Sequence, residues 1–226
     1  MEAPSKTSEE LNSLFYTYRS CEACGLHQNK KRLLSGAGSP GAKVVFLLDR
    51  VSYQASLSGN ILDGQEGQVL MNLLEHLGLP PDQFWYSYVV LCPPKGTGGW
   101  KGSEMLSLPK ASELTACRSR VHKEVHTIQP EMIIACGGTA LKSLHAKKAP
   151  PFTSNVGRVL ESPISGDLVS YPIPTMVTYS MLHLIRNQKS TLIWNKCLDH
   201  ISEAIAISET LSTMRMVPDT VADTAQ

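Results

Sequence analysis

Four cysteines have the types and spacing of a metal-binding set. Cys21 and Cys24 form a C-x-x-C step, which holds two thiolates close enough to share one metal centre. Cys92 follows an apolar segment, and Cys117 lies within the next predicted helix, so both can converge with the early pair. Four thiolates suit either a 4Fe-4S cluster or a tetrahedral zinc ion, and spacing does not separate the two. The alternative for Cys92 and Cys117 is that they are packed core thiols.

The composition indicates a cytoplasmic location. The first ten residues are polar and acidic, unlike a signal peptide, and the chain has no apolar run long enough to cross a bilayer. Six cysteines without an export signal point to a reducing compartment, where thiolates more often bind metal than form disulfides. Lys and Arg number 21 against 20 Asp and Glu, so any contact with DNA must come from local basic patches.

Short apolar segments alternate with segments of helical periodicity. Four segments are rich in β-branched and aromatic residues and are predicted to be strands, at residues 43–49, 84–91, 131–136 and 174–179. Helices are predicted between and after them, at residues 67–78, 110–128, from 138 onward and at 190–212. This alternation predicts a three-layer α/β/α sandwich with a central, mostly parallel four-stranded sheet. We expect one domain over residues 1–212 and a disordered tail over 213–226.

Several segments resemble one family of DNA repair enzymes. CEACGL, VVLCPP, ELTAC and QPEMIIACGGTAL occur in this order and resemble the thermophile-type (family 4) uracil-DNA glycosylases, from about Leu14 to Arg186. The resemblance implies a uracil-DNA-glycosylase-like fold and a 4Fe-4S cluster on Cys21, Cys24, Cys92 and Cys117. By elimination, the two remaining cysteines, at 136 and 197, are expected to be buried apolar thiols.

The same resemblance implies that the residues used for base excision are missing. The segment LDRVS at 48–52 resembles the family's Gly-Glu-x-Pro-Gly loop, so that the acid survives as Asp49. Leu62 resembles the Phe that stacks on uracil, Tyr88 the Asn that reads its edge, and Ser180 the His that stabilises the departing anion. A tyrosine does not present both an amide donor and an acceptor. Efficient excision of uracil is therefore not expected.

Three titratable residues remain candidates for altered catalysis. Asp49 and Asp63 lie near the end of the first predicted strand, and His183 lies three residues after Ser180. The alternative for the two aspartates is turn capping, and for His183 it is packing or surface exposure.

Basic residues indicate contacts with nucleic acid. We expect Lys30, Lys31, Arg32, Arg158 and Arg186 to contact DNA phosphates, with weak and salt-dependent affinity because the net charge is only +1. The alternative is that these side chains form solvated faces.

These observations favour an iron-sulfur protein that serves as a DNA-binding or protein-interaction module in replication, repair or modification, with lost or altered base excision. One alternative is an active glycosylase on uracil or a modified base. Another is a zinc-bound interaction protein unrelated to DNA. We expect DNA as a partner, with a further protein partner in replication or repair, and no membrane.

Overall fold

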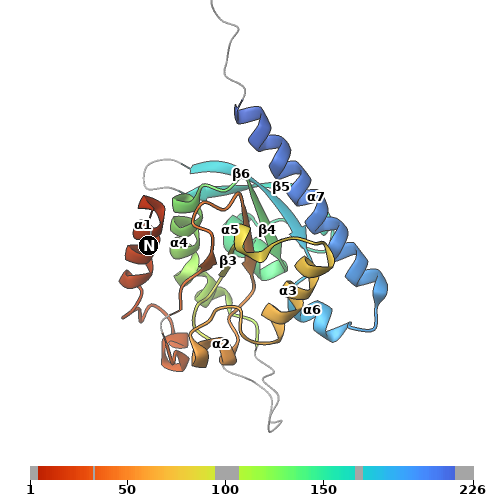
Figure 1. Ribbon diagram of the computed structural model, residues 1–226. Helices are drawn as coiled ribbons and strands as arrows, with labels where there is room; N and C mark the ends of the chain where they lie inside the picture. Colours follow the sequence, from red (N-terminus) through yellow and green to blue (C-terminus); the bar gives the residue numbers. More distant parts are fainter. Residues whose placement is uncertain (1–4, 33, 95–106, 166–169, 217–226) are drawn as a thin grey trace, which may run out of the picture.

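The computed structural model describes residues 5–32, 34–94, 107–165 and 170–216, and the strands within these residues form one sheet of six. Their order across the sheet is β1-β3-β2-β4-β6-β5. The strands are β1 (Ala37–Gly38), β2 (Val44–Leu48), β3 (Trp85–Tyr88), β4 (Met132–Cys136), β5 (Val159–Ser165) and β6 (Ser170–Thr178). Figure 1 shows this sheet in the middle of the molecule, with helices on both sides.

The four predicted strands form the parallel core of the sheet. β3, β2, β4 and β6 pair in parallel, as expected from their apolar sequences. The predicted number of strands, four, is nevertheless too low, because β1 and β5 pair antiparallel at the two edges of the sheet. β1 has only two residues, and β5 contains Pro163, which edge strands tolerate. Neither edge strand has the apolar run that identified the buried strands.

Helices cover both faces of the sheet, which confirms the three-layer sandwich. Side chains such as Phe46 and Ile134 face α3 (Gln65–His76) and α7 (Thr191–Met216), as part of one apolar cluster. Their neighbours, such as Leu47 and Ile133, belong to a second cluster with α4 (Ala111–Ile128) and α5 (Gly138–His145) on the other face. The remaining helices are α1 (Lys6–Thr17), α2 (Tyr53–Ser58) and α6 (Met181–Arg186), with short 3-10 turns η1 (Gly25–Asn29), η2 (Pro81–Gln83) and η3 (Ala146–Lys148).

The last helix is longer than predicted. α7 continues to Met216, so residues 213–216, expected in a disordered tail, form its final turn. The rest of that tail, residues 217–226, lies outside the described residues. None of the described helices combines the length and apolarity that crossing a membrane requires.

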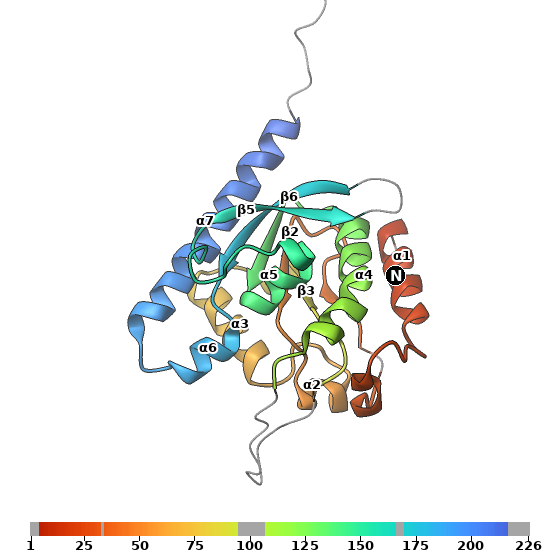
Figure 2. The same ribbon diagram turned by 180° about the vertical axis from the view of Figure 1, so that it is seen from behind.

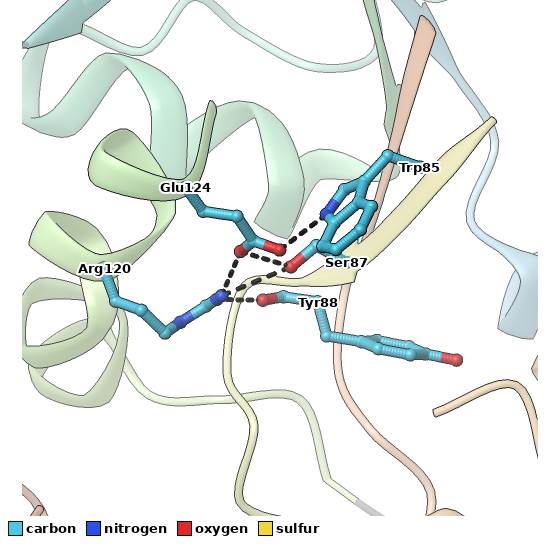
Figure 3. A network of polar contacts seen from close by, with 5 residues as sticks. All are labelled: Trp85, Ser87, Tyr88, Arg120 and Glu124. Atoms are coloured by element: carbon cyan, nitrogen blue, oxygen red, sulfur yellow. Dashed lines mark hydrogen bonds and ion pairs between the residues drawn. The ribbon is translucent and has the colours of Figure 1, made fainter. Parts of the chain in front are cut away.

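A buried ionic network joins α4 to β3 (Figure 3). Arg120 and Glu124 lie one turn apart on α4, pair with each other, and are only 2% and 1% exposed. Glu124 accepts hydrogen bonds from Trp85 Nε1 and Ser87 Oγ, both at 2.7 Å. Arg120 donates to the backbone oxygen of Tyr88, whose ring points away from the network. The network thus fixes the C-terminal end of β3 against one helix and leaves the Tyr88 ring on the opposite side of the strand.

Glu124→Ala is expected to destabilise the fold by about 3–5 kcal/mol, because Arg120 would remain buried without its counter-ion. The measurement is the free energy of unfolding from a urea titration. Glu75→Ala, at an exposed position of α3, is the control and should cost no more than about 0.5 kcal/mol. Equal stability of the two variants would contradict a structural role for the network.

Candidate functional site

Residues from three of the parallel strands, β2, β3 and β6, meet at one end of the sheet. Asp49 and Arg50 follow β2, Tyr88 ends β3, and Ser180 follows β6. In a parallel sheet the carboxyl ends of the strands share one edge, where α/β proteins bind ligands. These residues line one pocket, together with Leu48, Glu66, Leu108, Met181 and Leu182. The structure therefore brings together three of the positions singled out in the sequence, Asp49, Tyr88 and Ser180.

The pocket is almost filled by its own side chains. Its free volume is about 10 Å³. That is about the space that one water molecule requires. Tyr88 and Met181 are both buried at its wall, 1% and 2% exposed. In this conformation the pocket has no room for a nucleobase.

An ion pair that the sequence analysis missed forms part of the pocket wall. Arg50 Nη2 lies 2.9 Å from Glu66 Oε1, and the two side chains are 3% and 12% exposed. Arg50 Nε and Nη1 are also buried and have no hydrogen-bond partner within the described part of the chain. Glu66 lies in the first turn of α3, sixteen positions after Arg50, and no local pattern in the sequence signals the pairing. The pocket thus contains a buried cation with donor capacity that its acidic partner does not use.

Asp49 contacts the start of α5. Its Oδ1 accepts a hydrogen bond from the backbone N–H of Ala140 at 3.2 Å. Gly137, with φ of 106°, allows this approach, because a Cβ there would lie 2.6 Å from Asp49 Oδ2 and 2.8 Å from Ser180 Cβ. Burial raises the pKa of Asp49 to about 7, although hydrogen bonds from Ala140 and Thr139 lower it. Asp49 is therefore both a cap for a helix and an acid that titrates near neutral pH.

The other sequence candidates are not among the residues that line the pocket. Asp63 accepts a hydrogen bond from Ser52 Oγ through its backbone oxygen, at 2.7 Å. Leu62 packs against the apolar cluster beneath α3. The ring of His183 stacks on Tyr179, with centroids 5.1 Å apart. Ser180 caps α6 by accepting a hydrogen bond from the backbone N–H of His183.

The four predicted ligand cysteines lie in one corner of the molecule. Cys21 and Cys24 lie between α1 and η1, Cys92 follows β3, and Cys117 lies on α4. All four are half-buried free thiols. Burial raises the pKa of Cys92 to about 11, and the charges of Cys117, Cys24 and Cys21 raise it further. The pKa of Cys117 is raised by burial, with Arg120 opposing. The four sulfurs are therefore close enough to interact electrostatically.

Four thiols are a donor set that suits either a 4Fe-4S cluster or a zinc ion. Among the described residues, no three His, Cys, Asp or Glu side chains approach closely enough to hold one metal ion. The other two cysteines, Cys136 and Cys197, are buried, as the sequence predicted.

The predicted basic residues do not form one surface. Lys30, Lys31 and Arg32 line an open hollow of about 510 Å³, with Tyr16 and Arg19, which the sequence analysis missed. Arg158 and Arg186 are exposed but do not line it. Arg186 ends α6, which lies on the side of the molecule opposite α1 in both views (Figures 1 and 2).

Comparison with known proteins assigns the family. Residues 35–204 match the model of the uracil DNA glycosylase superfamily. The chain is 26% identical to a type-4 uracil-DNA glycosylase of Thermotoga maritima, over 82% of this chain and 89% of the relative. It is 22% identical to one of Saccharolobus solfataricus, over 88% of each chain. A third, from Sulfurisphaera tokodaii, is 27% identical over 60% of this chain and 58% of its own length. The chain therefore belongs to the uracil DNA glycosylase superfamily.

Proposed function

We propose that this protein is a cytoplasmic iron-sulfur member of its superfamily that binds DNA in replication, repair or modification and has lost efficient excision of uracil. The observation that carries the proposal is the pocket of about 10 Å³ where the strand ends meet. A glycosylase must extrude its target base and enclose it in a fitted pocket. A pocket with space for one water molecule does not enclose a base.

The residues that fill the pocket support the same conclusion. Tyr88 stands where the resemblance places an edge-reading Asn, and Ser180 where it places the anion-stabilising His. The Arg50–Glu66 pair is buried within the wall, so an entering base must displace or separate two charges. Separating a buried ion pair is costly, because each charge loses its partner before it gains a new one.

The cysteine corner supports the iron-sulfur part of the proposal. Cys21, Cys24, Cys92 and Cys117 would hold a 4Fe-4S cluster, which would tie α1, β3 and α4 together at one corner. Because burial raises the pKa of Cys92 and Cys117, these thiols carry protons at neutral pH until a metal binds, so cluster assembly would release protons. A zinc site on the same four residues is the alternative.

A second candidate function is altered chemistry that uses Asp49. This carboxyl lines the pocket and has a pKa of about 7, which suits a general acid or base at neutral pH. Asp63 and His183 lie outside the pocket lining and have weaker geometric support for this role.

We predict no measurable excision of uracil from single-stranded or duplex oligonucleotides, since the base has no space in the pocket. The measurement is strand cleavage after alkaline treatment, extended to a panel of modified bases. Robust cleavage by the native chain would contradict the proposal. If Asp49→Ala abolished that cleavage and Asp63→Ala did not, the second candidate would be supported instead.

We predict that freshly purified protein is brown, with bound iron and a broad absorbance band near about 400 nm. Cys92→Ala and Cys117→Ala should lose the band and the iron, because each removes one of four ligands. Cys136→Ala is the matched control and should retain both, since Cys136 is buried in β4 away from the corner. A colourless protein with one equivalent of zinc would support the zinc alternative.

Asp49 should also make stability depend on pH. Its pKa is raised from 3.8 to about 7 on folding, so the folded state favours the protonated form. The associated stability is complete below about pH 4 and is lost as pH rises to about 7. We therefore predict that Asp49→Asn is about 1–3 kcal/mol more stable than the native protein at pH 8, relative to their difference at pH 4. Urea titrations at both pH values measure this; a difference independent of pH would show that Asp49 ionises normally.

A further inference from the structure

The strongest unassigned surface feature is the hollow lined by Tyr16, Arg19, Lys30, Lys31 and Arg32, which we call the basic hollow. Its volume is about 510 Å³. Four of its five lining residues are cations, although the whole chain has a net charge of only +1. The residues come from two segments, the end of α1 and the stretch after η1. Four cations from two segments therefore surround one hollow.

Contacts between the two segments hold the basic hollow in shape. Lys30 Nζ donates to the backbone oxygen of Arg19 at 2.7 Å, which joins the stretch after η1 to the end of α1. The guanidinium of Arg19 lies 6.0 Å from the centre of the Tyr16 ring. Lys30 is thus used as a structural tie, and Arg19 is positioned by an aromatic ring.

The outer cations of the basic hollow have no acidic partner. Arg19, Lys31 and Arg32 are exposed, and no ion pair within the described residues includes any of them. Tyr16 is 67% exposed. An aromatic surface beside unpaired cations matches a ligand that has both negative charges and flat rings.

We propose that single-stranded nucleic acid binds in the basic hollow, with Arg19, Lys31 and Arg32 contacting phosphates and Tyr16 stacking on an unpaired base. Proteins that bind single strands combine a positive groove with aromatic stacking residues, because every unpaired base offers a π face. In duplex DNA the bases are already stacked on one another, so Tyr16 would have no free base face to contact. This inference rests on the DNA role proposed above and specifies where the strand binds.

The location of the basic hollow connects it to the pocket. The backbone N–H of Lys31 donates to Ser56 Oγ on α2 at 3.0 Å. Arg32 also packs near Gly59, which ends α2. α2 begins at Tyr53, directly after the segment that carries Asp49 and Arg50. A strand that leaves the basic hollow along α2 therefore reaches the loops around the pocket, at the lower end of the sheet in Figure 1.

The test is a fluorescence anisotropy titration of a labelled oligothymidine single strand, at several salt concentrations, with protein that carries its metal. Arg19→Gln/Lys31→Gln/Arg32→Gln should weaken binding at least tenfold in low salt. It should also reduce the slope of log affinity against log salt by about 2, since each phosphate contact contributes about 0.7. The matched control, Lys123→Gln/Lys189→Gln/Lys196→Gln, removes three exposed cations elsewhere and should change affinity less than threefold. If the triple variant misfolds, Arg32→Gln alone should reduce the slope by about 0.7.

Tyr16 gives an independent readout. Tyr16→Ala should weaken single-strand binding about tenfold without changing the salt slope, and Tyr16→Phe should bind like the native chain. The inference is overturned if the basic-hollow variant behaves like its control, if Tyr16→Ala has no effect, or if duplex binds as tightly as the single strand. If the native protein and the triple variant both bind the oligonucleotide, and with equal affinity, the DNA role stands and this location is refuted. Native protein that binds no oligonucleotide even in low salt would refute both.

Discussion

The contact on which the rest of the structure depends is the buried pairing of Arg120 and Glu124 on α4 with the end of β3. Arg120 binds the backbone oxygen of Tyr88, and Glu124 accepts from Trp85 and Ser87. The side chains of neighbouring residues in a strand point to opposite faces, so Ser87 faces α4 while the ring of Tyr88 lines the pocket. Cys117 lies one turn before Arg120, and Cys92 lies four residues after Tyr88. One network therefore fixes both the pocket wall and two of the four thiols.

The closed pocket follows from the cost of burying charge. Arg50 is 3% exposed, and a buried guanidinium without a counter-ion would be strongly destabilising. Glu66 provides that counter-ion from the first turn of α3, where a carboxylate is also favoured by the helix dipole. The pair then forms part of the wall of a pocket whose free volume is about 10 Å³. Once Arg50 is present in this wall, neutralising its charge and keeping the pocket open are competing requirements.

The sequence predicted the features that depend on local patterns. The parallel strands and most helices follow from apolar runs and periodicity. The cysteine-containing motifs indicated the family. Features that depend on tertiary contacts were missed. The spacing of Arg120 and Glu124 fits a surface helix pair, and only the fold shows that both are buried. Arg50 and Glu66 are sixteen residues apart on a loop and a helix, so no periodicity links them. Apolar and polar residues alternate only weakly along β5, which also contains Pro163, so the sequence analysis did not recognise it as an edge strand.

Pairing of the buried acids also determines the charge on the surface. Glu66 and Glu124 are used to neutralise Arg50 and Arg120 inside the protein, so these four residues contribute little to the outer field. Near the cysteine corner, the adjacent cations Lys30, Lys31 and Arg32 also divide into one that contacts the protein itself and two that face solvent. Lys30 donates a hydrogen bond to the backbone oxygen of Arg19, and the charge of Lys30 lowers the pKa of Cys92. Lys30 therefore interacts with groups of the protein itself. Lys31 and Arg32 are exposed and remain available to an external anion. A short run of three adjacent cations thus supports the thiols with its first member and leaves the other two for a ligand.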